Sequence, residues 1–301
     1  MKCDFLTLSE IQELSGSTYS DSLTMKLYDS TADFISQYLG HSFGQGMRIW
    51  HDGTGATLAT FTWTVAVTST GIILSTTNPA SSTTLLFATY PTLREMAHAI
   101  QSLSGGTSDV LSGWEAAVAF EKYTELSSSF LSVVTEVQAA IALGNTGYAY
   151  RKVFCLDTFC ETLSGNGESR LFLRMPIASI SSVTEDGIAL TAGTDYWAKN
   201  HLGVLIRAGS AGCCYVGGCR YTTGCWSMRQ PNNVTVVYSP TWFSIRPMAI
   251  VSAIHGLMVL AMSTSGYQSE RIGDYSYAKD GASALMWLQT LESYVSPLSI
   301  F

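Results

Sequence analysis

The chain has few charged side chains. Asp, Glu, Lys and Arg make up 13% of its 301 residues, against about 25% in an average soluble domain. Hydrophobic residues reach 47%. A surface with so few solvating charges predicts that partner molecules cover much of it. The formal net charge of −7 argues against broad attraction to DNA phosphates. It does not exclude a local basic patch.

The sequence also lacks a hydrophobic run of the roughly 20 residues that a helix needs to cross a bilayer. Its most apolar stretch, 247–262, has helical spacing, is shorter than a span and carries His255, so we expect a buried core helix. We do not expect the beginning of the chain to be a signal peptide, because Asp4 interrupts it and no apolar core follows. We therefore expect an intracellular setting in which the seven cysteines are thiols.

No catalytic constellation is evident. The five histidines are scattered and accompany no nucleophile elbow; they are His41, His51, His98, His201 and His255. Residues 51–55 are glycine-rich like a phosphate cradle, but no Lys-Ser/Thr pair follows. A turn between strands is the better interpretation of 51–55. The sequence predicts neither an enzyme nor a cofactor.

A cluster of cysteines leaves three interpretations open. Its members, which fall within thirteen residues, are Cys213, Cys214, Cys219 and Cys225. Four thiolates can hold zinc in a tetrahedron, and two cysteines can pair as a disulfide. The spacing is not the paired C-x-x-C arrangement of common zinc sites, so we prefer packing as small hydrophobic residues and assign no metal site.

Start and stop signals predict five helices. Capping boxes begin a short helix after Thr7 and another after Thr92. A longer helix should run from Asp21 or Ser22 to Leu39. Its predicted apolar side consists of Leu23, Leu27, Phe34, Ile35, Tyr38 and Leu39. Pro247 suits the first turn of the apolar helix, and a last helix over 282–295 ends before Pro297.

Alternating apolar residues predict strands in the middle of the chain. In 60–67 the alternation places Phe61, Trp63, Val65 and Val67 on one face. Further expected strands are 72–74, 84–87, 114–120, 171–173, 180–183, 188–190, 196–197, 204–206 and 234–238. Asp186-Gly187 predicts a tight hairpin turn. For 130–143 both strand and helix stay open, and we favour a helix from Thr135.

The order of several steps resembles the head-to-tail adaptor (connector) proteins of tailed bacteriophages. Near the beginning, a short and a long helix lead into an aromatic-Leu-Gly-x-x-Phe step at 38–43. The later steps are Met175-Pro176, Val183, Asp186-Gly187, Tyr196 and Gly203, then strand 234–238, Arg246-Pro247 and the segment 270–277, which contains IGDYS. The resemblance covers about 1–45 and 168–301.

The resemblance implies an α+β fold. It consists of an adaptor-type bundle of four helices with a small antiparallel β-meander, plus an inserted small α+β domain. Residues 1–46 would supply the first adaptor helices and 47–166 the inserted domain. Residues 167–301 would supply the meander and the C-terminal helices.

The resemblance also implies a function. The chain would be a virion structural protein of the neck that forms a ring below the portal protein and above a stopper or tail-completion protein. About twelve copies would match the portal, and DNA would pass through the lumen without sequence-specific binding. The expected subunit and portal contacts are Arg271, Asp274, Tyr275, Tyr277, Leu298, Ile300 and Phe301. The alternatives are another tail-completion or decoration protein, or a host-surface binding module carried by the insertion.

Overall fold

The computed structural model describes most of the chain. The described residues are 6–15, 20–39, 44–54, 61–77, 80–103, 112–138, 147–209, 224–228, 230–240, 248–267, 288–289 and 291. Contacts divide the chain into two compact units. The first contains Met1–Leu156 and Ile245–Val295, and the second contains Asp157–Ser244 and Ser296–Phe301. The boundary at Leu156 lies earlier in the chain than the sequence-based one at 166.

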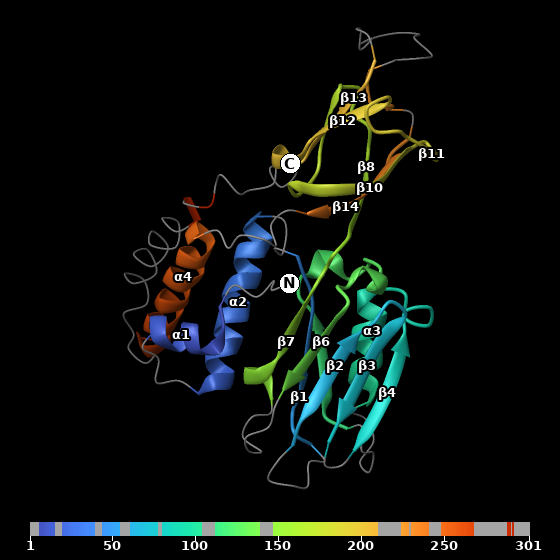
Figure 1. Cartoon of the computed structure of the whole chain (residues 1–301). Helices are drawn as coiled ribbons and strands as arrows, with labels where there is room; N and C mark the ends of the chain where they lie inside the picture. Colours follow the sequence, from blue (N-terminus) through green and yellow to red (C-terminus); the bar gives the residue numbers. More distant parts are fainter. Residues whose placement is uncertain are drawn as a thin grey trace. The chain divides into compact units, whose positions relative to one another are not determined.

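Three helices of the first unit pack on one another. They are α1 (Leu8–Ser15), α2 (Asp21–Leu39) and α4 (Met248–Tyr267) (Figure 1). The predicted capping box begins α1, because the Thr7 amide donates to Glu10 at 2.7 Å and the Glu10 amide donates back to the Thr7 hydroxyl at 3.3 Å. The helix α4 follows Pro247 as expected and buries Ile250, Ile254 and Met258.

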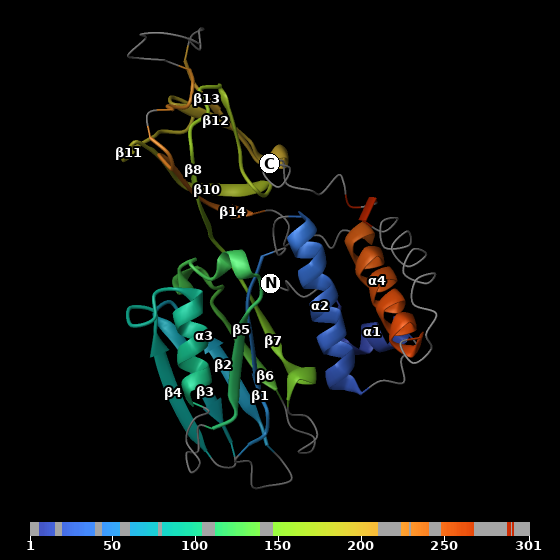
Figure 2. The same ribbon diagram turned by 180° about the vertical axis from the view of Figure 1, so that it is seen from behind.

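Two antiparallel sheets and a helix complete the first unit. Their elements are β1 (Gln45–His51), β2 (Trp63–Val67), β3 (Gly71–Thr76), β4 (Ser81–Leu86), α3 (Leu93–Ser102), β5 (Trp114–Val118), η2 (Glu121–Tyr123), η3 (Ser128–Phe130), β6 (Val134–Gln138), η4 (Tyr148–Tyr150) and β7 (Lys152–Cys155). One sheet has the order β5-β1-β7 and the other β4-β3-β2-β6 (Figure 2). Gln45 pairs with Cys155, so the polypeptide enters and leaves this region on neighbouring strands.

Aromatic side chains join the two sheets. Trp63 from β2 and Trp114 from β5 meet edge to face with ring centroids 5.6 Å apart, and His51 lies 5.0 Å from Trp114. The alternation predicted for 60–67 is confirmed, because Phe61, Trp63, Val65 and Val67 are all buried. Burying four large apolar side chains contributes about 1.5–3 kcal/mol each before ordering costs.

The second unit is made of strands. They are β8 (Phe159–Leu163), β9 (Arg170–Phe172), β10 (Ile177–Glu185), β11 (Ile188–Ala189), β12 (Tyr196–Lys199), β13 (Val204–Arg207) and β14 (Val234–Pro240), with the short helix η5 (Asn200–Leu202). Their two antiparallel sheets have the orders β11-β10-β14-β8 and β12-β13-β9. The Asp186-Gly187 turn is confirmed, since both residues have positive φ, 50° and 78°, as a two-residue hairpin loop requires.

The predicted fold class is wrong. An adaptor-type four-helix bundle with a small β-meander and a small inserted α+β domain does not describe the molecule. In the described part of the chain the structure is mostly β, with fourteen strands in four sheets and four α-helices. The stretch expected to be a small insertion, 47–166, supplies eight of those strands, β1 to β8, of which β1 begins two residues earlier at Gln45. Its threonine, serine and β-branched residues favour pleated strands over helices.

Two local predictions are also wrong. Residues 134–138 form the strand β6 beside β2 and not a helix from Thr135, because Val134, Thr135 and Val137 fit a half-buried pleated surface. The bounds predicted for α2 are confirmed, but two residues assigned to its buried side, Leu23 and Phe34, are 42% and 48% exposed. Polar Asp29 takes a place on the buried side instead.

Candidate functional site

The residues that the sequence proposed as contacts cannot be placed. Arg271, Asp274, Tyr275, Tyr277, Leu298, Ile300 and Phe301 lie outside the described residues, as do Cys213, Cys214 and Cys219. So does almost all of the predicted last helix, 282–295.

The cysteines differ from the sequence-based expectation of thiols. Cys155 and Cys225 each take part in a disulfide, so Cys225 is not available as a thiolate for zinc. Cys160 is a free thiol whose pKa is raised by burial and by Glu161. Within the described ranges no three His, Cys, Asp or Glu side chains come together as metal ligands.

A buried ionic cluster fastens α2 to the sheet β5-β1-β7. Its members are Asp29, Asp33, Gln45, Arg48, Tyr148 and Arg151, and we call it the Asp29 cluster. Arg151 donates through Nη2 to Asp29 Oδ1 at 2.5 Å and through Nε to the other oxygen, and the Tyr148 hydroxyl donates to Asp29 at 2.7 Å. Arg48 forms a fork with Asp33, with distances of 2.6 and 3.0 Å.

The surroundings of the Asp29 cluster raise the pKa values of two of its members, Arg48 and Tyr148. Burial alone would lower the pKa of Arg48, but Asp29 and Asp33 outweigh it and raise that pKa above the usual value. Burial, followed by Asp29, raises the pKa of Tyr148, so its hydroxyl keeps its proton and donates it. Four members, Asp29, Gln45, Arg48 and Arg151, are all buried and leave no open face for a substrate. We interpret the cluster as a structural clamp.

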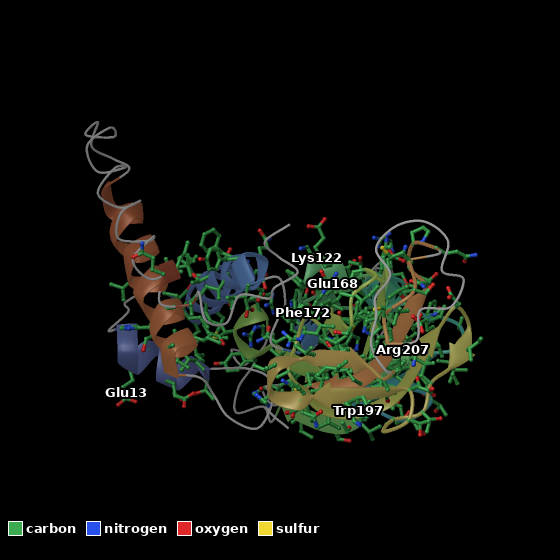
Figure 3. All side chains as sticks on the ribbon, turned by 90° about the horizontal axis from the view of Figure 1, so that it is seen from above. Glu13, Lys122, Glu168, Phe172, Trp197 and Arg207 are labelled. Carbon is green, nitrogen blue, oxygen red and sulfur yellow. The ribbon has the colours of Figure 1, made fainter. Side chains whose placement is uncertain are left out.

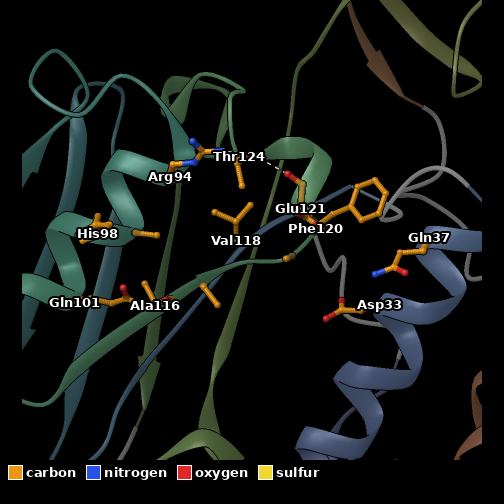
Figure 4. Close-up of a pocket in the computed structure, with 13 residues that line it drawn as sticks. Asp33, Gln37, Arg94, His98, Gln101, Ala116, Val118, Phe120, Glu121 and Thr124 are labelled. Atoms are coloured by element: carbon orange, nitrogen blue, oxygen red, sulfur yellow. Dashed lines mark hydrogen bonds between the residues drawn. The ribbon is translucent and has the colours of Figure 1, made fainter.

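A groove follows the free edge of β5. Its volume is about 430 Å³, within the usual range of roughly 300–1,000 Å³ for ligand pockets. Three elements form it (Figure 4): α3 supplies Arg94, Ala97, His98 and Gln101, α2 supplies Asp33 and Gln37, and the β5 region supplies Ala116 to Phe120, Glu121 and Thr124. Small residues such as Ala116, Ala117 and Ala119 and polar residues such as Arg94, His98 and Gln101 line the groove together.

One face of the sheet β12-β13-β9 is rich in aromatic and basic side chains. In its register Trp197 pairs with Ile206, which pairs with Arg170. Lys199 pairs with Val204, which pairs with Phe172, and residues two apart share a face. Trp197 is 53% and Phe172 is 36% exposed (Figure 3). We call Arg170, Phe172, Trp197, Lys199 and Ile206 the Trp197 face.

Two glutamates of the second unit are buried for structural reasons. Burial raises the pKa of Glu161, although the Tyr238 hydroxyl and the Arg174 amide donate to its carboxylate. Glu185 accepts from Arg207 Nε at 3.1 Å and from the Ser227 amide at 2.7 Å. Each glutamate closes a local network, and neither faces the pocket described above.

The described part of the glycine-rich segment, 51–54, does not form a phosphate cradle. His51 is buried, and its Nδ1 accepts from the Gly53 amide at 3.0 Å. The Thr54 amide donates to Asp52 at 2.7 Å. The amides of Gly53 and Thr54 are thus already engaged and do not offer the donors that a phosphate would need. Burial lowers the pKa of His51 to about 4, so its imidazole is neutral near pH 7. The sequence-based preference for a turn fits this geometry.

Comparisons of the chain with protein-family models, with curated proteins and with solved structures find no match. In the described part of the chain, no helix has both the length and the apolar character to cross a membrane.

Sequence reasoning missed both described surfaces. The Trp197 face carries only a weak signal, because Tyr196-Trp197-Ala-Lys199 looks like an ordinary strand until its pairing is known. The groove carries a single weak signal, the uncharged run Ala116 to Ala119. That run does not reveal the groove, because α2, α3 and β5 meet only through long-range contacts.

Proposed function

We propose that the protein is a virion structural protein, a head-to-tail adaptor that forms a ring below the portal and connects capsid and tail. The observation that carries the proposal is the Trp197 face. Exposed Trp, Phe and Arg are the side chains that most often anchor protein interfaces. An exposed sheet face that bears them supports a binding role for this unit.

The charges of the Trp197 face suit an acidic neighbour. Arg170 and Lys199 are exposed, and no Asp or Glu shares the face within the paired residues of β9, β12 and β13. The whole chain carries a net charge of −7, so a local basic patch can meet an acidic surface of another copy. Such a head-to-tail contact between two different surfaces closes into a ring when the rotation fits.

The composition supports only the general statement that partner molecules cover much of the surface. The specific role as an adaptor comes from the sequence steps that resemble the adaptor family. In this proposal the ring contains about twelve copies, and 270–277 and 298–301 add contacts to neighbours or to the portal. The protein works without a catalytic step, and its net acidity keeps passing DNA from adhering to the lumen. It resides in the neck of the virion after synthesis in the host cytoplasm.

Sedimentation and negative-stain imaging of the full chain with the portal of the same phage test the proposal. Rings that co-sediment with the portal are expected, and Trp197→Ala should weaken them. Absence of portal binding would overturn the adaptor role.

A second candidate function rests on the region from β1 to β7. This region has its own aromatic core between two sheets, and its ends are paired at Gln45 and Cys155, which suits a grafted binding module. Portal-independent binding of the purified chain to host cells would favour a host-surface module.

A further inference from the structure

We propose that the edge of β5 in the groove pairs with an extended segment of a second copy of this chain, which adds a strand to the sheet β5-β1-β7. The inference rests on the proposed ring in one respect, namely that the partner is another copy. Its geometric basis is the direction of the β5 backbone groups.

The alternation of hydrogen bonds fixes that direction. The Ala119 amide donates to the Gly46 carbonyl at 3.1 Å, and the Asp52 amide donates to the Gly113 carbonyl at 2.8 Å. In an antiparallel pair every second residue bonds to the partner strand. Glu115, Ala117 and Ala119 therefore bond to β1, while the N–H and C=O groups of Ala116 and Val118 point away from it.

One of these outward groups already has a side-chain partner. Gln101 from α3 donates through Nε2 to the Ala116 carbonyl at 2.7 Å, which confirms that the carbonyl faces the free edge. Val118, the next outward residue, lines the groove. Its N–H and C=O offer the donor and acceptor that a further strand would use.

The sides of the groove suit a polypeptide backbone. Residues Ala116, Ala117 and Ala119 are small, so another backbone can approach closely. On α3 the groove-facing residues Arg94, His98 and Gln101 follow helical spacing along one side, and on α2 Asp33 and Gln37 do the same on the other (Figure 4). Arg94 is paired with Glu125 at 2.8 Å and Asp33 with Arg48, so the rim is close to charge-balanced. An uncharged or weakly charged segment fits there.

The outward backbone groups of β5 lie in a run without charged side chains. Soluble proteins protect edge strands with charged residues, proline or bulges. The strand carries Glu115, but 116–119 is Ala-Ala-Val-Ala; the edge strand β4 likewise has no charged residue, whereas β6 carries Glu136 and β7 carries Lys152. An edge without such protection is present in every copy. A head-to-tail contact covers it in every copy at once, and a ring is the closed form of that contact.

The test uses the full chain and Val118→Pro. Proline removes the outward N–H without removing a bond to β1, and edge strands accept proline. Val118→Thr, which keeps the N–H and the branched shape, is the matched control. In sedimentation velocity over a concentration series, we expect the wild type and Val118→Thr to associate and Val118→Pro to need at least tenfold higher concentration.

A second pair of variants keeps the test decisive if Val118→Pro does not fold. Gln37→Trp fills the groove from the exposed surface of α2, while Ser30→Trp adds the same bulk to an exposed position of α2 that does not line the groove. We expect only Gln37→Trp to weaken association. Unchanged association of Gln37→Trp, or a wild type that stays monomeric at every concentration, would overturn the inference. A wild-type monomer that forms rings on the portal would overturn the inference and leave the adaptor proposal standing.

Discussion

Replacing Asp29 with asparagine should separate α2 from the sheet that it clamps. Asp29 and Arg151 are 3% and 2% exposed in their side chains, and Asp29 accepts two bonds from Arg151 and one from Tyr148. Asparagine keeps the shape but removes the charge, which leaves the buried Arg151 guanidinium without compensation. Breaking a buried pair in this way costs about 3–5 kcal/mol.

The assay must report on the first unit, because the chain has two compact units and a single unfolding transition is not guaranteed. Calorimetry should show the first unit melting about 6–20 °C lower, at roughly 2–4 °C for each kcal/mol in a unit of this size. Hydrogen exchange of the α2 amides should accelerate in parallel.

Asp33→Asn is the control for Asp29→Asn. Asp33 also accepts from Arg48, but its side chain is 36% exposed and Asp29 lies 3.5 Å from Arg48 Nε, so its loss should cost less than the loss of Asp29. The double variant Asp29→Asn with Arg151→Gln should lose less than the sum of the single variants, because neither charge is then left alone. A loss of less than about 1 kcal/mol for Asp29→Asn would refute the clamp.

Three further outcomes are expected. Folding lowers the pKa of His51 to about 4, because the buried ring is neutral in the folded protein. As the pH falls from 6.5 to about 4, the free energy of unfolding should therefore decrease by up to about 3 kcal/mol. The difference in melting temperature between wild type and His51→Gln should change within that pH window and stay constant above it. Gly203→Ala should cost more than Gly193→Ala in urea unfolding, since both have positive φ but only at Gly203 would a Cβ lie 2.5 Å from a backbone oxygen, that of Met175; equal losses would contradict the steric argument. Trp197→Ala should weaken assembly on the portal by about 2 kcal/mol with the melting temperature unchanged; a matching drop in melting temperature would point to a packing role.

Local signals in the sequence predicted local structure well. The capping box at Thr92 is observed, with the Glu95 amide donating to the Thr92 hydroxyl and the Thr92 amide donating to the Glu95 carboxylate. The turn at Asp186-Gly187 and the bounds of α2 are also confirmed. Each of these features depends on residues close together in the chain, where one side chain or one φ value decides the outcome.

The overall architecture depended on contacts that no local pattern contains. The buried place of Asp29 could not be predicted, because its partners Tyr148 and Arg151 are 119 and 122 positions away. The strand β6 was mistaken for a helix because its pairing with β2 joins residues such as Val67 and Val134. The family resemblance concerns the order of short steps, and it did not reveal that the region from β1 to β7 would make the molecule mostly β.

Assembly on the portal tests the central claim most directly. The purified full chain, mixed with the portal of the same phage, should co-sediment with it, and negative-stain images should show a closed ring of about twelve subunits on one end of the portal. A chain that stays monomeric and does not bind the portal would contradict the proposed adaptor function.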